Sequence, residues 1–313
     1  MMKDALQPTD YASLSLHVDA LVESAPGDYS ACLTALMRAM REEFPALARE
    51  RNPIVAGLGS WTRAQLGFII EEYSAFSNAA IHMFLEARIR NHWSALRDEI
   101  VRNMDEEMGT LTSGIPHLEL MRHGYRVELG LETDGLQYAG VTEDFIRRMS
   151  LLFHTRDNTR LAGVLLAFEG TAVSEFRIVE AMLRRYKEMT GGVIPPESLT
   201  GCYVAGHVAP EASITDHDPE MDHYRGMAEA VGAGVAGHEL QPLVRGFLSV
   251  CLELNRWWEL LALEALQRRI RDRLAHQGAP PDPYRALRVR LTAPGRAVHG
   301  TDPDAAWIER GLA

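Results

Sequence analysis

A run of carboxylates followed by a histidine is the first feature of this 313-residue chain that could carry chemistry. Glu106 and Glu107 stand near the end of an expected helix, and His117 follows ten residues after Glu107. A carboxylate at a helix end and a histidine on the next helix can converge across the turn between them. Carboxylate oxygens with imidazole suit iron or manganese better than thiolate sites do. A solvated acidic helix face would give the same residues, so this segment alone leaves both interpretations open.

A single glutamate, Glu169, interrupts the apolar run from Leu165 to Ala172. An ionised carboxylate inside a helical protein is costly unless a cation or hydrogen-bond donors meet it. A metal ion would meet that need, and so would an arginine such as Arg160 or Arg177, which are near in sequence. The position therefore predicts a buried carboxylate with a cationic partner of one kind or the other.

The third segment runs from Asp216 to His223 and contains two histidines among its acidic residues. Glu220 and His223 are three residues apart, which places them on one face of a helix. Helical di-iron carboxylate proteins use the Glu-x-x-His spacing to direct two ligands at one metal pair. Asp216 or His217 could add a ligand from just before that helix. An acidic helix start, favoured by the helix dipole, is the alternative, but it accounts less well for the two histidines.

Long helices are expected to position these segments, because apolar residues recur at helical spacing along most of the chain. The pattern predicts helices over about 29–51, 60–90, 92–107, 116–130, 142–156, 158–190, 219–230 and 240–277, and few strand signals. The fold class is therefore all-α, a bundle of about seven to nine helices around one core. Residues 1–28 are interpreted as an N-terminal extension, 29–277 as the helical domain and 278–313 as an extended C-terminal tail.

Composition narrows the partners that this chain is expected to have. Its formal net charge of −11 argues against nucleic acid and anionic membranes, both of which favour an excess of Lys and Arg. The three cysteines, Cys32, Cys202 and Cys251, form no CxxC pair, so neither a disulfide framework nor a structural zinc site is indicated. With no signal-peptide pattern and no apolar run of about 20 residues, a soluble cytoplasmic protein is expected.

Taken in chain order, the three segments resemble the haem-oxygenase-like di-iron oxidase and oxygenase family. Members show Asn-x-x-Asp/Glu-Glu-x-Gly with a histidine about ten residues later, matched here by Asn103, Glu106, Glu107, Gly109 and His117. They next show a glutamate and a glycine in mid-helix, matched by Glu169-Gly170. The family's last motif, His-x-x-x-Asp-x-x-His, is matched only in part, since it places Asp216 at the first histidine and Glu220 at the aspartate.

The resemblance implies a bundle that holds two irons per chain, with O2 as co-substrate. It implies six ligands from this chain: Glu107, His117, Glu169, Asp216, Glu220 and His223. Three choices stay open. Glu106 could replace Glu107, His217 or His207 could replace Asp216, and Glu71 or Glu72 could add a carboxylate, although Ser77 stands near the position where some members have one.

The implied activity is that of an O2-activating oxidase or oxygenase acting on a small amine or amino-acid-like metabolite in natural-product biosynthesis. N-oxygenation, oxidative decarboxylation and C–C cleavage are all known in the family. An external electron donor and a homodimer are also expected. Two alternative functions also remain open: a metal-independent enzyme on the same bundle, similar to pyrroloquinoline-quinone synthase or the thiaminases, and a non-catalytic helical binding protein.

Four arginines are candidates to bind a substrate carboxylate: Arg122, Arg126, Arg147 and Arg177.

Overall fold

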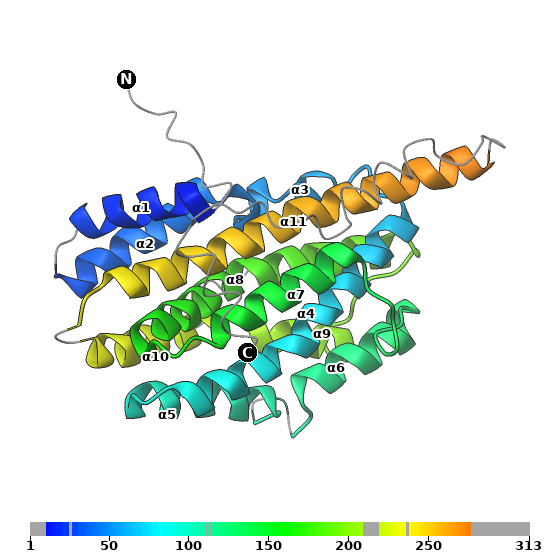
Figure 1. Ribbon diagram of the computed structural model, residues 1–313. Helices are drawn as coiled ribbons and strands as arrows, with labels where there is room; N and C mark the ends of the chain where they lie inside the picture. The colour runs from blue at the N-terminus through cyan, green and yellow to red at the C-terminus, as the bar shows by residue number, and fades with distance from the viewer. Residues whose placement is uncertain are drawn as a thin grey trace. The chain divides into compact units, whose positions relative to one another are not determined.

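The computed structural model describes residues 11–24, 27–110, 112, 114–208, 219–235 and 238–276. Within these residues all regular structure is helical, which confirms the all-α prediction (Figure 1). Eleven α-helices are described, more than the seven to nine expected: α1 (Tyr11–Ser24), α2 (Tyr29–Glu43), α3 (Pro53–Ala56), α4 (Arg63–Arg90), α5 (Ser94–Glu107), α6 (His117–Gly124), α7 (Gly140–Phe153), α8 (Asn158–Glu188), α9 (Leu199–His207), α10 (Pro219–Gly234) and α11 (Gln241–His276).

The additional helices lie where the sequence was interpreted as irregular. Residues 1–28 were expected to be a turn-rich extension, but α1 forms there and buries Leu14 and Val18. The helix expected over 29–51 ends at Glu43, because Pro45 follows, and two short 3-10 turns, η1 (Pro45–Leu47) and η2 (Arg49–Arg51), replace its second half. The stretch 191–216 was expected to lack structure, yet it contains α9, which starts at a Ser198 N-cap.

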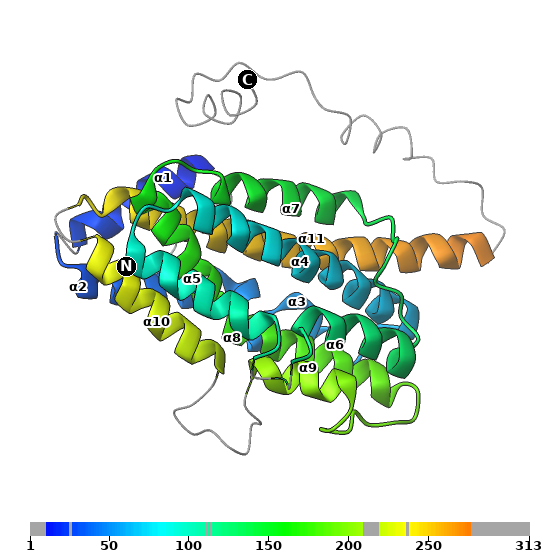
Figure 2. The same cartoon turned by 90° about the horizontal axis from the view of Figure 1, so that it is seen from below.

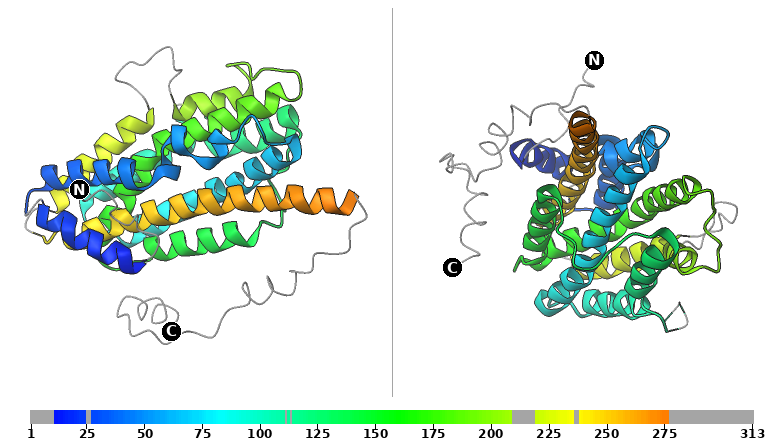
Figure 3. Two further views of the ribbon diagram at one scale, coloured as in Figure 1. Left: turned by 90° about the horizontal axis from the view of Figure 1, so that it is seen from above. Right: turned by 90° about the vertical axis from the view of Figure 1, so that its right-hand side faces the viewer.

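The chain is divided into two compact units, residues 1–263 and residues 264–313. The boundary between them falls inside α11. The second unit is described only as the end of that helix, residues 264–276, and the tail expected over 278–313 lies outside the described residues. In the first unit α4, α7 and α8 pack against one another (Figures 1 and 3). Trp257 of α11 stacks on Phe145 of α7, with ring centroids 4.4 Å apart, and Trp258 stacks on Tyr73 of α4.

A pair of glycines sets how closely α8 and α11 approach in the first unit. A Cβ atom on Gly163 would overlap the backbone carbonyl of Leu243, and one on Gly246 would overlap that of Arg160. Only glycine lets two helix backbones cross at this distance. α8 runs through Gly163 without interruption, as the helix predicted over 158–190 requires.

The helices that carry the three chemical segments form one side of this bundle (Figure 2). There α10 packs on both α5 and α8, and α6 packs on α9. The ends of α5 and α6 and the middle of α8 are thereby brought to one region. Among the described residues, no helix has both the length and the apolar character needed to cross a lipid bilayer.

Candidate metal centre

The turn between α5 and α6 brings Glu107 and His117 together. Gly109 in this turn has φ +102°, and a Cβ there would lie 2.6 Å from the backbone of Ile115, so this tight return of the chain requires glycine. Glu107 ends α5, and His117 begins α6. Their facing atoms, Glu107 Oε1 and His117 Nδ1, are 3.5 Å apart. The convergence across the turn that the sequence predicted is therefore present.

His207, the last residue of α9, completes a first group of donors with Glu107 and His117. Its Nδ1 lies 4.0 Å from Glu107 Oε1, and its ring centroid is 4.6 Å from that of His117. The imidazole is held flat against the Phe176 ring, with centroids 3.6 Å apart, and is 3% exposed. One donor atom from each of the three residues lies within 4.8 Å of the others.

A second group consists of Glu169 from the middle of α8 with Glu220 and His223 from α10. All three side chains are buried, and their donor atoms again lie within 4.8 Å of one another. His223 Nδ1 is 3.9 Å from Glu169 Oε2, and the amide of Asn103 donates to Glu169 Oε1 at 3.0 Å. The predicted i, i+3 face of α10 therefore does meet the buried glutamate of α8.

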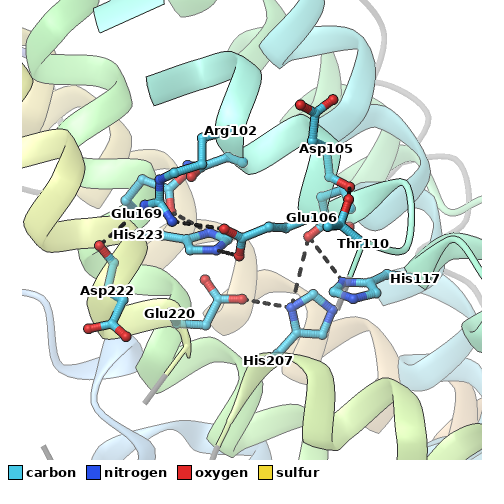
Figure 4. A network of polar contacts seen from close by, with 12 residues as sticks. Arg102, Asp105, Glu106, Thr110, His117, Glu169, His207, Glu220, Asp222 and His223 are labelled. Carbon is cyan, nitrogen blue, oxygen red and sulfur yellow. Dashed lines mark hydrogen bonds and ion pairs between the residues drawn. The ribbon is translucent and has the colours of Figure 1, made fainter. Parts of the chain in front are cut away.

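The two groups are contiguous, as Figure 4 shows. His207 Nδ1 and Glu220 Oε1 are 2.6 Å apart, so a residue of the first group touches a residue of the second. Glu106 lies beside them and contacts His223 Nε2 through one carboxylate oxygen, while its other oxygen accepts from Arg102 Nη1 at 2.8 Å. Glu106 and Glu107 thus face different histidines from adjacent positions on α5.

The carboxyl groups of the centre have strongly perturbed protonation. Burial raises the pKa of Glu169 well above its ordinary value, and the nearby Glu220 raises it further. Burial also acts to raise the pKa of Glu107, but the adjacent His117 and the charges of the neighbouring histidines outweigh it, and the net shift is downward. For His207, burial disfavours the imidazolium and lowers the pKa to about 3. A neutral imidazole is the form that binds metal.

Buried ring nitrogens without hydrogen-bond partners indicate that these donors could bind metal ions. Both ring nitrogens of His117 and Nε2 of His207 are buried and have no hydrogen-bond partner in the described structure. Buried polar atoms in folded proteins are nearly always satisfied, so unpartnered ones at such a site call for an explanation. Nitrogen and oxygen donors that converge in the first group provide one, because a metal ion there would bind one ring nitrogen of each histidine.

Of the six ligands that the sequence predicted, the structure brings five into this centre: Glu107, His117, Glu169, Glu220 and His223. The sixth, Asp216, lies outside the described residues, as does His217. His207 stands in the first group, and the sequence analysis named it only as a possible replacement for Asp216. Neither Glu71 nor Glu72 belongs to a group, and the Glu72 carboxylate accepts the backbone N–H of Ala139 at 2.9 Å at the start of α7.

A cavity that is partly open to solvent adjoins the two groups, and residues of both groups line it. Aromatic side chains form much of its wall, and Ser77 of α4 lines it at the place where some relatives were expected to have a carboxylate. Glu175 also lines it, and burial raises the pKa of this carboxyl to about 8. Such a mainly apolar pocket with a few convergent polar groups is the usual form of a small-molecule site.

Comparison with known proteins places the chain in a family. Residues 31–264 match the family described as a domain of unknown function with a solved structure, DUF3865. The chain belongs to this family. The DUF3865 match covers the helices that carry both donor groups. No curated protein matches the chain.

Solved structures from Nostoc punctiforme PCC 73102 are similar to this DUF3865 member in fold. Two crystal structures of a CADD-like protein of unknown function superpose with TM-scores of 0.65 and 0.64. They are 23% and 22% identical to it, and cover 80% and 81% of this chain and 99% and 97% of their own. This likeness shows the helical fold and leaves the activity to be argued from the site.

Proposed function

We propose that this protein is a non-haem di-iron oxidase or oxygenase that activates O2 and acts on a small amine or amino-acid-like metabolite. The observation that carries the proposal is the pair of contiguous, largely buried His/Glu groups, Glu107–His117–His207 and Glu169–Glu220–His223. Each group offers three donors from at least two helices. Two metal ions side by side in such a bundle are the arrangement that helical di-iron carboxylate proteins use.

The charge of the centre supports divalent cations as its occupants. Glu107, Glu169 and Glu220 place three carboxyl groups among three imidazoles, and Glu106 lies directly behind His223. Arg102 is already engaged by Glu99 and Glu106, so it does not neutralise the remaining three carboxylates directly. Mixed carboxylate and imidazole donors without thiolate suit iron or manganese.

Several residues around the donors would hold them in place. Asn103 fixes one oxygen of Glu169, and Glu106 fixes the His223 ring through Nε2, leaving Nδ1 turned toward Glu169. Partners of this kind orient ligands and tune their basicity. When bound, two ferrous ions would supply the electrons for reducing O2, and the apolar cavity wall would keep water away from the reacting substrate.

The wider assignments belong to the same proposal. The fold and the donor groups support membership of the haem-oxygenase-like di-iron proteins. An external reductant would return the irons to the ferrous state, and a homodimer in the cytoplasm is the expected form. Cys32, Cys202 and Cys251 are all free thiols in the structure, which agrees with a reducing compartment.

Iron loading and O2 consumption test the proposal. The purified chain is incubated with Fe(II) without oxygen, desalted, and analysed by inductively coupled plasma mass spectrometry. Two irons per chain are expected, with O2 uptake and a change in visible absorption once air is admitted. The Glu169→Gln variant should lose iron, whereas Glu180→Gln should keep it, because Glu180 is also buried on α8 but pairs with Arg177 and Arg184.

Two results would contradict the di-iron assignment. Iron at background level in the wild-type chain would remove its basis. Full activity on a substrate in the presence of a strong chelator would instead favour a metal-independent enzyme on the same bundle.

A further inference from the structure

A buried carboxyl group in the cavity belongs to neither donor group. Glu175 of α8 is 5% exposed and lines the cavity, and its Oε1 has no hydrogen-bond partner in the described structure. The carboxyl group contacts the Thr171 side chain. Burying a carboxyl without satisfying both oxygens is costly, so a group that enters the cavity and donates to Oε1 would relieve that cost.

The cavity wall indicates which kind of group this is. Six aromatic rings line the cavity: Tyr73, Phe76, Phe84, Phe168, Phe176 and Tyr203. The described lining includes no lysine and no arginine. Aromatic faces attract cations through the ring quadrupole, and an ammonium group beside a buried carboxyl group favours its ionised form and donates charge-assisted hydrogen bonds to it. The combination favours a cationic ligand and opposes an anionic one.

The arginines that the sequence offered for a substrate carboxylate have partners elsewhere. Arg122 and Arg126 both pair with Asp134, Arg147 pairs with Asp144, and Arg177 pairs with Glu180. None of the four lines this cavity. Among the described lining residues, the cavity therefore has a carboxyl group to anchor an amino group and no lysine or arginine to anchor a carboxylate.

We infer that Glu175 and the aromatic wall form the binding site for the ammonium group of a primary amine substrate whose body is apolar or aromatic. The inference deepens the proposed function, because it rests on the same cavity. Glu175 is six residues from Glu169 on α8, which corresponds to about 9 Å along the helix axis. An amino group bound at Glu175 is thus offset from Glu169 along α8, and the other end of the substrate then lies toward Glu169.

A matched set of probes tests the charge preference on the wild-type chain. 3-Phenylpropan-1-amine, 3-phenylpropan-1-ol and 3-phenylpropanoate share one body and differ in the charge of the end group. Their affinities are measured by isothermal titration calorimetry on the Fe(II)-loaded chain without oxygen, so that no turnover occurs. The amine is expected to bind at least tenfold more tightly than the alcohol, and the carboxylate more weakly than both. Equal affinity for the amine and the alcohol would overturn the inference.

The Glu175→Gln variant assigns the preference to this residue. It should lose at least tenfold in amine affinity while its affinity for the alcohol changes little, and its iron content should match the wild type. Glu180→Gln is the control, since Glu180 is buried on the same helix but lines no part of this cavity. An amine preference that survives Glu175→Gln would overturn the role of Glu175.

The design separates this inference from the proposed function. The iron measurement reports on the two donor groups, and the probe affinities, repeated on metal-free chain, report on the amine site. Amine preference without any iron binding would support the inference and refute the di-iron proposal. Two irons per chain with no amine preference would support the di-iron proposal and refute the inference.

Discussion

Replacing His207 with glutamine tests the feature of the centre that the family pattern does not contain. His207 supplies one of three donors in the first group, and its Nε2 is buried without a hydrogen-bond partner. Loss of a residue behind a metal ligand typically weakens binding about 10–100-fold. Loss of a direct donor from a three-residue group should weaken metal binding at least as much as the upper end of this range, about 100-fold. Glutamine keeps a polar side chain of similar length, which limits the packing change beside Phe176.

The expected size of the effect follows from binding linkage. At a free Fe(II) concentration of 100 times its Kd, a single site stabilises the native state by about 2.7 kcal/mol. If the mutation weakens that site about 100-fold, the same concentration equals the new Kd, and the stabilisation falls to about 0.4 kcal/mol. Comparing each variant with its own metal-free form cancels the change in packing energy that the mutation causes.

The assay is denaturant unfolding with and without Fe(II) under anaerobic conditions, together with iron content by mass spectrometry. His207→Gln should retain about one iron per chain, and Asp216→Ala and His217→Ala should retain two. If His207→Gln binds two irons as tightly as the wild type while either of the other variants loses one, the assignment of His207 to the first group is wrong.

Three further predictions concern residues that support the fold or the donors. Glu72→Ala should lower the free energy of unfolding by about 1–3 kcal/mol, because it removes the acceptor of the Ala139 N–H, and should leave the iron content unchanged, both measured on the purified variant. Gly163→Ala should cost about 1–3 kcal/mol or more by forcing α8 and α11 apart, seen as a lower denaturation midpoint with no change in iron per folded chain. Glu106→Gln should weaken Fe(II) binding about 10–100-fold in titrations by disturbing His223, without removing a direct donor.

The long helices could be predicted because their apolar residues repeat at helical spacing over many turns. The helix expected over 158–190 is observed as Asn158–Glu188, and the one expected over 92–107 as Ser94–Glu107. A short helix contains fewer repeats of the apolar pattern. The nine-residue α9 was therefore not predicted, because it lies in a stretch rich in proline and glycine. It is stable in the fold because it is capped by Ser198 and packs on α6, and the second of these is a long-range contact that no local pattern reports.

The donors were predictable to the extent that they neighbour one another in sequence. Glu107 and His117 are linked by one turn, and Glu220 and His223 share a helix face. His207 has no such neighbour, because its partners Glu107 and His117 are about ninety to one hundred residues earlier in the chain. A histidine at the end of an unpredicted helix offers no local spacing, so only the packing of α9 on α6 places it.

The choice between Glu106 and Glu107 also could not be made from the sequence, because it depends on which distant residues each side chain meets. Adjacent residues on a helix point about 100° apart, so the sequence suggests that only one of the pair faces the centre. In the structure both contribute, because the centre extends along two sides of α5: Glu107 faces His117 and His207, and Glu106 faces His223. The chain has Asp216 where the family's third motif has its first histidine, and the first group still has three donors. A histidine on α9 lies within reach of Glu107 and Glu220 alike.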